Sequence, residues 1–498
     1  MDSRVQTDLS VREDASVTEA TDIRTPDASN DQRGRGWIEV ICGSMFSGKS
    51  EELIRRLRRA EIARQKVQVF KPRIDDRFDD NHIVSHSRQR ILSQRVTTSA
   101  ELYGSVAPDT HVVGIDEAQF YDDGLIEVCQ RLIAEGRFTM GREVRRFEDA
   151  FAQKFGMKHA VMANSGSSAN LIAVAALFHV RDRPLERGDE VIVPTYTFTA
   201  TAEVVRYLGA KPVFVDCEED TFNVGVAQVE PAITDRTKAI MPVHFAGLPC
   251  DMTSLGELAR RHNLKVLDDA AHALPTRHRG RMIGNCETDA TAFSFYANKT
   301  ITTGEGGMLV TKNEDLARRA RHMRLHGISR DVFNRFTDPK ANWEYDIIAP
   351  GFKYNMTDIA AAIGLHQLPR AETFRTAREA ICQAYDERLA GLPLILPAAE
   401  QPGDLHSRHL YIVRPAANAR LDRMALIAAL QEQNIGVSVH YKPLHRMTYW
   451  QETFGLQEGA FPNAEAIGAS CISLPLFPDM SEAEIDYVVA ALTELLSA

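Results

Sequence analysis

The chain has 498 residues, of which 44% are hydrophobic and 25% are charged, with a formal net charge of -10 and seven cysteines. This length exceeds what one hydrophobic core holds, so two or three domains are expected, and no run approaches the roughly 18 apolar residues that a membrane span needs. The acidic balance gives no electrostatic basis for binding nucleic acid, so small-molecule chemistry fits better. The scattered cysteines, without a C-x-x-C pair, favour neither a zinc site nor a disulfide framework, and their odd number without a signal peptide predicts reduced thiols in a cytoplasm.

The N-terminal part of the sequence predicts a disordered tail followed by a small α/β module. Residues 1–36 are rich in Asp, Ser, Thr and Arg and have no sustained apolar period. Order is expected to begin at WIEVICGSMFSGKS, an apolar strand that leads into a glycine-containing loop, and EELIRRLRRAEIARQ then has helical apolar spacing. Further strands are expected at KVQVFKP and in HVVGIDEAQF, whose apolar run ends in two carboxylates. We assign residues 37–136 to this module.

The loop GSMFSGKS fits the phosphate-binding pattern G-x-x-x-x-G-K-S, with a predicted strand before it and a predicted helix after it. Gly43 and Gly48 allow backbone N–H groups to face phosphate oxygens. Lys49 adds a positive charge near the terminal phosphates, and the hydroxyl of Ser50 can ligate Mg²⁺. The pattern therefore predicts a nucleotide phosphate site.

With KPRIDDRF, IVSHS and IDEAQFYDD, this loop makes the module resemble the type II thymidine kinase family. The resemblance implies ATP and Mg²⁺ at the loop, Asp116 as a support for the metal, and Glu117 as the general base toward the nucleoside 5′-hydroxyl. A helix N-cap with its dipole partner is the alternative for these two acids. Such kinases continue with another strand, a zinc ribbon of cysteine pairs and a loop over the nucleoside, none of which follows here. We expect a truncated P-loop module.

From about residue 138 the pattern restarts as a larger α/β domain. The amphipathic helix GREVRRFEDAFAQKFG is followed by apolar strands that alternate with helices: HAVMAN, DEVIVP, KPVFVD, KAIMPV, LKVLDD and ATAFSF. This alternation predicts a mostly parallel sheet covered on both faces, within residues 137–370. Residues 371–498 have a long helix, the strand HLYIVR and two further helices, which predict a smaller α+β domain. The window at 124–141 contains the junction between the two parts.

An ordered series of motifs gives residues 125–498 a second resemblance. The motifs are GRFTMGREVRRFEDAFA, MANSGSSANL, VPTYTFTATAEVV, PVHFAG, LDDAAHALPT, FSFYANKTITTGEGGM, GFKYNMTDIAAAIGLHQL, VSVHYKPLH and SLPLFPDM. They resemble the sugar aminotransferases of the DegT/DnrJ/EryC1/StrS family. The resemblance implies the fold type I architecture of pyridoxal phosphate (PLP) enzymes, with a large α/β/α domain and a small α+β domain. It also implies PLP as cofactor and a homodimer.

Lys299, which follows an apolar strand, takes the position of the catalytic lysine in this resemblance. Transamination needs an amine that holds PLP as a Schiff base and then moves a proton between substrate and cofactor carbons. Relatives that dehydrate the sugar have histidine instead, so lysine favours amino transfer. The run NKTITTGEGGM is similar to enzymes that aminate the C4 keto group of nucleotide-linked keto-deoxy sugars, commonly with L-glutamate as the amino-acid donor.

The cofactor ring needs a carboxylate that keeps its nitrogen protonated. Asp269, at the end of LKVLDD, takes the family position, and Asp268 is its rival on spacing alone. His272 would face the phenolic oxygen of the ring. Phe198 matches the aromatic residue that stacks on the ring, although Tyr196 competes for that role.

The cofactor phosphate needs N–H donors and the positive end of a helix, and NSGSSANLIAVAAL provides a small-residue turn that opens into an apolar helix. The backbone of Gly166 and Ser167 is expected to hold the phosphate. Ser294 would add a hydroxyl, and Asn355 would reach the same phosphate from the partner subunit. An ordinary helix cap is the alternative for this turn.

Three functions remain open on these grounds. The first is a PLP-dependent sugar aminotransferase of nucleotide-sugar metabolism. The second is an ATP-dependent thymidine kinase, and the third is a nucleotide-binding module that regulates the aminotransferase.

Overall fold

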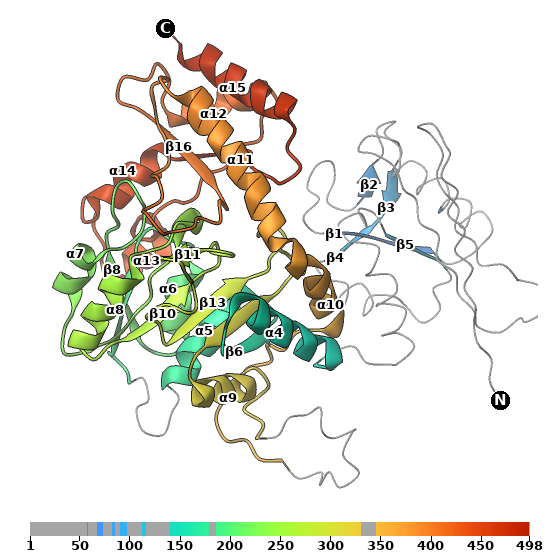
Figure 1. Cartoon of the computed structure of the whole chain (residues 1–498), viewed down its shortest axis with the longest axis vertical. Coiled ribbons are helices and arrows are strands. Elements are labelled where there is room, and N and C mark those ends of the chain that lie inside the picture. The colour runs from blue at the N-terminus through green and yellow to red at the C-terminus, as the bar shows by residue number, and fades with distance from the viewer. Residues whose placement is uncertain are drawn as a thin grey trace, which may run out of the picture. The chain divides into compact units, whose positions relative to one another are not determined.

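The computed structural model describes residues 57, 67–72, 82–84, 90–96, 112–115, 140–178, 186–329 and 345–497 (Figure 1). The chain divides into two compact units, residues 1–122 and 123–498. Within the described residues, no helix has both the length and the hydropathy required to cross a membrane.

The first unit contains a three-stranded parallel sheet in the order β4-β1-β5. The described strands are β1 (Val67–Pro72), β2 (His82–Val84), β3 (Arg90–Leu92), β4 (Gln94–Val96) and β5 (Val112–Ile115), and β2 pairs with β3 in antiparallel fashion. The strands predicted at KVQVFKP and within HVVGIDEAQF are thus confirmed. The predicted nucleotide-site residues lie outside the described residues: Gly43, Gly48, Lys49, Ser50, Asp116 and Glu117.

The second unit is built on a seven-stranded sheet in the order β6-β14-β13-β10-β9-β7-β8. Its strands are β6 (His159–Ala163), β7 (Glu190–Pro194), β8 (Lys211–Val215), β9 (Thr237–Ile240), β10 (Lys265–Asp269), β13 (Ala290–Ser294) and β14 (Gly307–Thr311). All neighbours are parallel except β14, which runs antiparallel to both β13 and β6. The predicted mostly parallel sheet is confirmed, but the sequence did not predict β14, because its five residues follow the glycine-rich turn directly.

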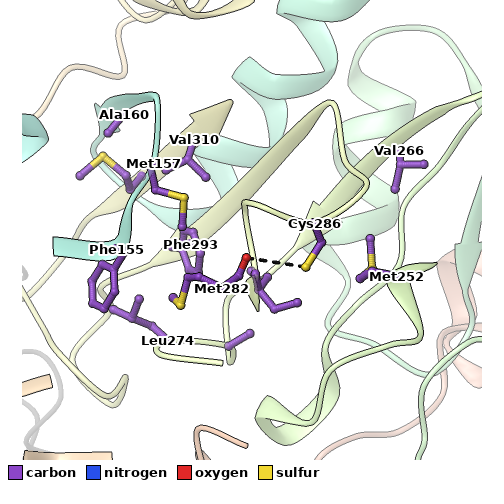
Figure 2. Close-up of a cluster of buried hydrophobic side chains, with 14 of the residues drawn as sticks. Phe155, Met157, Ala160, Met252, Val266, Leu274, Met282, Cys286, Phe293 and Val310 are labelled. Carbon is purple, nitrogen blue, oxygen red and sulfur yellow. Dashed lines mark hydrogen bonds between the residues drawn. The ribbon is translucent and has the colours of Figure 1, made fainter. Parts of the chain in front are cut away.

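Helices cover the sheet on both faces (Figure 1). They are α4 (Arg142–Phe155), α5 (Gly166–Phe178), α6 (Ala200–Tyr207), α7 (Val226–Val229), α8 (Met252–Arg261), α9 (Glu314–Met323) and α10 (Asp358–Gln367). One core contains residues of α4 and α8, and a second contains residues of α5, α6 and α9. Consecutive strand residues alternate between the cores, so Val266 lies in the first and Leu267 in the second. Figure 2 shows part of the first core, where the thiol of Cys286 donates to the carbonyl of Met282 at 3.6 Å.

The C-terminal part forms a smaller sheet with its own core. The antiparallel order is β15-β16-β17. The elements are α11 (Ala371–Leu389), β15 (Leu394–Ile395), β16 (Tyr411–Pro415), α12 (Arg423–Glu432), α13 (Thr448–Phe454), α14 (Pro462–Ser470), β17 (Ile472–Leu474) and α15 (Glu482–Leu496). Shorter elements of the second unit are β11 (Arg277–His278), β12 (Arg281–Met282), η2 (Glu230–Ala232), η3 (Phe245–Gly247), η5 (Leu368–Arg370) and η6 (Leu444–Arg446). The predicted α+β character of this part is therefore confirmed.

The start of α4 depends on a carboxylate that is distant in sequence. The side chain of Asp358, at the first turn of α10, is fully buried and accepts the N–H groups of Gly141 at 2.6 Å, Glu143 at 2.9 Å and Val144 at 3.1 Å. A Cβ at Gly141 would lie 2.5 Å from an Asp358 oxygen, so only glycine allows this approach. Burial raises the pKa of Asp358, while the three N–H donors oppose that shift. Asp358 therefore caps α4 and ties it to α10.

We predict that Asp358→Ala lowers the free energy of unfolding by about 2–3 kcal/mol, because three buried N–H groups lose their acceptor. The matched control is Asp422→Ala, which removes the exposed cap of α12 at the N–H of Ala425 and is expected to cost about 1 kcal/mol. Urea unfolding of the two variants measures the difference. Equal losses in both variants would show that Asp358 is an ordinary helix cap.

Candidate active site

Lys299 lies in the turn that follows β13, with its backbone N–H bonded to the carbonyl of Tyr296 at 2.9 Å. Among the described residues, the polar contact of its amine is with Nε2 of His409, at 3.5 Å. Burial lowers the pKa of Lys299 from 10.5 to about 8, and the negative charge of Asp269 acts in the opposite direction. A lysine of this kind is a neutral nucleophile over more of the physiological pH range than a surface lysine.

The two carboxylates at the end of β10 lie on opposite faces of the sheet. Oδ2 of Asp269 accepts hydrogen bonds from Nδ2 of Asn170 on α5, at 2.9 Å, and from Oγ1 of Thr201 on α6, at 2.8 Å. Asp268 instead accepts from Thr291 at 3.0 Å and lies 3.7 Å from Nε2 of His244. Of the two, Asp269 is the carboxylate whose charge acts on Lys299. The geometry thus favours the family position, Asp269, over its rival.

Sequence reasoning missed Asn170 and Thr201 as site residues. Both are buried polar residues on helices, within the motifs MANSGSSANL and VPTYTFTATAEVV. A buried polar side chain needs a hydrogen-bond partner, so each could have been singled out, although its partner could not.

Two histidine rings lie close together beside the lysine. His272, which follows β10, lies with its ring centroid 4.4 Å from that of His409, and its Nε2 is 3.2 Å from the hydroxyl of Tyr441. Burial, followed by the charge of Lys299, holds the pKa of both histidines well below the usual range. Within the described residues, Nδ1 of each ring lacks a hydrogen-bond partner. Both rings are therefore neutral, and the site contains unsatisfied polar atoms that a ligand can meet.

The small-residue turn before α5 brings two of the predicted phosphate residues together. A Cβ on Gly166 would lie 2.7 Å from Cβ of Ser294, at the end of β13. The N–H of Ser168 donates to Oγ of Ser165 at 3.0 Å, which caps the helix, and Ser167 is exposed. The turn therefore presents a helix N-terminus beside a serine hydroxyl, an arrangement suited to an anion.

Asn355 lies next in sequence to Tyr354, whose carbonyl accepts the N–H of Asn164 at 2.9 Å. The oxygen of the Asn355 side chain accepts a hydrogen bond from Lys353. Its role toward the phosphate of a partner subunit stays a prediction.

The structure distinguishes Tyr196 from Phe198 by the burial of their rings. Tyr196 is 0% exposed, its hydroxyl donates to the carbonyl of His440 at 2.6 Å, and its ring packs against Phe222 and Phe245. Phe198 is 57% exposed, and its ring centroid is 5.9 Å from that of Tyr441. Of the two rings, Phe198 has a face available to a ligand.

Taken together, these residues provide an amine nucleophile, a carboxylate, two neutral imidazoles, an aromatic face and a helix N-terminus. Among the described residues, no group of three or more His, Cys, Asp or Glu side chains could hold a metal ion. The described side chains give the site an amine with acid and base groups beside it.

Comparisons with known proteins identify several relatives of the chain. The chain is similar to the spore coat polysaccharide biosynthesis protein SpsC of Bacillus subtilis, with 41% identity over 374 residues, 74% of this chain and 94% of that protein. It is also similar to the crystal structure of S. venezuelae DesV in complex with a ketimine intermediate, with 33% identity, a TM-score of 0.67, and coverage of 75% of this chain and 94% of that one. A third similarity is to the PLP-form of Spr1654 from Streptococcus pneumoniae, named as a sugar aminotransferase, with 31% identity, a TM-score of 0.67, and coverage of 76% and 97%.

Two family models match the chain. Residues 36–177 match the thymidine kinase model, and residues 121–493 match the model of the DegT/DnrJ/EryC1/StrS aminotransferase family. In the overlap, the described residues from 140 onward form α4, β6 and α5 of the second unit. The aminotransferase match spans most of the chain. The chain therefore belongs to the DegT/DnrJ/EryC1/StrS aminotransferase family.

Proposed function

We propose that the protein is a PLP-dependent aminotransferase that transfers an amino group from L-glutamate to a nucleotide-linked keto-deoxy sugar. Its product would serve the biosynthesis of polysaccharide or lipopolysaccharide sugars. The observation that carries the proposal is the buried amine of Lys299, with its pKa lowered to about 8, 3.5 Å from Nε2 of His409 and close enough to Asp269 and His272 for their charges to interact. This is the constellation that amino transfer requires of the protein.

The residues of the site fit PLP. Lys299 is the amine for its aldehyde, and the turn at Gly166 and Ser167, with Ser294, suits its phosphate. Phe198 has an exposed ring face for the pyridine ring. Nδ1 of His272 has no hydrogen-bond partner among the described residues, and its ring is close enough to Lys299 for the charge of the amine to lower its pKa. When bound, PLP supplies the electron sink that stabilises negative charge on the substrate carbon.

Asp269 and Lys299 have separate proton-handling roles in this proposal. Two donors from α5 and α6 fix Oδ2 of Asp269, and the N–H of Ala271 donates to Oδ1 at 3.1 Å, so the orientation of the carboxylate is fixed at both oxygens. The carboxylate would hold a proton on the pyridine nitrogen of the cofactor. Lys299, as a neutral amine, would take a proton from one carbon and return it to the other.

The sugar substrate is supported by the names of relatives and by the sequence. SpsC is named for polysaccharide biosynthesis and Spr1654 as a sugar aminotransferase. The lysine at position 299 favours amino transfer over dehydration, and the similarity of the run NKTITTGEGGM to enzymes that aminate C4 favours that carbon of the sugar. We also propose a homodimer, in which Asn355 reaches the phosphate of the partner subunit, and a cytoplasmic location.

A second function is proposed for the N-terminal module, because residues 36–177 match the thymidine kinase model. The module would bind ATP and Mg²⁺ at GSMFSGKS, with Glu117 as the base, or it would regulate the aminotransferase by binding nucleotide. ATP-dependent phosphorylation of thymidine that disappears in Glu117→Gln is the expected sign of kinase activity. No thymidine turnover by the wild-type protein would rule this activity out, and transamination rates indifferent to ATP and to Lys49→Ala would rule out the regulatory role.

The aminotransferase proposal is tested with a panel of nucleotide-linked keto sugars, following the loss of L-glutamate. We expect wild-type turnover with at least one sugar and a fall in kcat of about 100-fold or more in Asp269→Asn, because a neutral amide cannot hold the ring proton. Asp268→Asn is the matched control and should change kcat by less than about tenfold, because that side chain faces the other core.

Two outcomes would contradict the proposal. One is an absence of glutamate consumption with every keto sugar. The other is an equal loss of kcat in both variants while thermal unfolding shows them equally stable, because Asp269 would then have no special position.

A further inference from the structure

His409 contacts the amine of Lys299 but is absent from the residues that the sequence motifs single out. Its Nε2 lies 3.5 Å from Nζ of Lys299, and the residue is 5% exposed. Its ring also packs against that of His272, with a centroid distance of 4.4 Å and an interplanar angle of 38°. Burying a polar ring between the amine and His272 costs free energy unless the acceptor nitrogen of the ring has a hydrogen-bond donor beside it.

The backbone of His409 is fixed from two sides. Its N–H donates to the carbonyl of Ala246 at 3.0 Å, and its carbonyl accepts from Nη1 of Arg378 at 3.3 Å. Arg378 is buried on α11 and also donates to the carbonyl of Leu476 at 3.0 Å. The guanidinium therefore ties the segment of His409 to α11 and to the chain that follows β17.

The two residues before His409 are also fixed by contacts of their side chains. Arg408 has a left-handed φ of 53°. For a residue with a side chain this conformation costs on the order of 1 kcal/mol and persists only where neighbours enforce it. Its guanidinium lies 2.9 Å from Glu379 and 3.1 Å from Glu400, and the hydroxyl of Ser407 donates to the carbonyl of His272 at 2.6 Å. These contacts fix the backbone from which the imidazole of His409 extends toward Lys299.

The groups around the ring keep it neutral. The titratable or charged neighbours that act on His409 are Lys299, His272, Arg378 and His440. Burial is the largest cause that holds the pKa of His409 well below its usual range, and the neighbouring Lys299 is the next largest. In the tautomer that carries its proton on Nδ1, Nε2 of the neutral ring is an acceptor toward the amine of Lys299.

We propose that His409 is a positioning residue for Lys299, whose free amine donates a hydrogen bond to Nε2 and is thereby held in the orientation that receives and returns a proton. This inference rests on the proposed aminotransferase function. His409 itself neither gains nor loses a proton, so the transferred proton stays on the lysine nitrogen. A carboxylate at this place would instead stabilise the ammonium form and withdraw the nucleophile, whereas a neutral imidazole orients the amine with little effect on its charge.

The test uses two polar variants of similar size and the full chain freed of cofactor. In His409→Gln the side-chain amide reaches the place of Nε2, whereas in His409→Asn it is too short. The rate at which Lys299 captures added pyridoxal phosphate is followed by absorbance as a function of pH. We expect a rate within about threefold of wild type for Gln and a fall of about tenfold for Asn, as for loss of one hydrogen bond.

The midpoint of the pH profile separates positioning from packing. Capture should rise with pH as the amine loses its proton, with a midpoint near 8 in all three proteins, because burial sets the pKa of Lys299. Wild-type rates in both variants, equal losses in both, or a midpoint that moves up toward that of a solvated lysine would each overturn the inference. Failure of the wild-type protein to capture pyridoxal phosphate would instead count against the proposed function.

Discussion

The desolvation of one amine is the constraint on which the site depends. Burial lowers the pKa of Lys299 to about 8, and the negative charge of Asp269 opposes this shift. A carboxylate in direct contact would keep the amine charged. Instead, the carboxylate of Asp269 accepts hydrogen bonds from α5 and α6, and the amine contacts the neutral ring of His409. The large and small domains both contribute to this balance, because β10 and β13 supply the acid and the lysine turn while the segment before β16 supplies the imidazole.

The alternation of side chains along β10 places Asp268 and Asp269 on opposite faces of the sheet. Val266 and Leu267 enter different cores, and the next pair, Asp268 and Asp269, continues the same alternation. Asp269 thus emerges on the side of α5 and α6, where Asn170 and Thr201 bind it, and Asp268 on the side of His244. A shift of register by one residue would exchange the two carboxylates.

Much of this arrangement could be predicted from the sequence, because the decisive signals are local. The strand and helix alternation predicted the covered parallel sheet, and the motifs singled out Lys299, Ser294 and the turn at Gly166. The choices between neighbours could not be made, because they depend on contacts far apart in sequence: Tyr196 is buried by residues 26 to 275 positions away, whereas Phe198 is left exposed. His409 was missed for the same reason, since it is 110 positions from Lys299. The strand β14 was missed because it is short and follows a glycine-rich turn.

The most direct test of the account is chemical capture of the cofactor on its lysine. The protein is mixed with pyridoxal phosphate, reduced with borohydride, digested and analysed by mass spectrometry. The account predicts that the reduced cofactor is attached to the peptide that contains Lys299, and that the label is lost from Lys299→Ala but kept in Lys312→Ala, a change at an exposed lysine bonded to the carbonyl of Asn285. Attachment at another lysine, or at none, would contradict the assignment of this site.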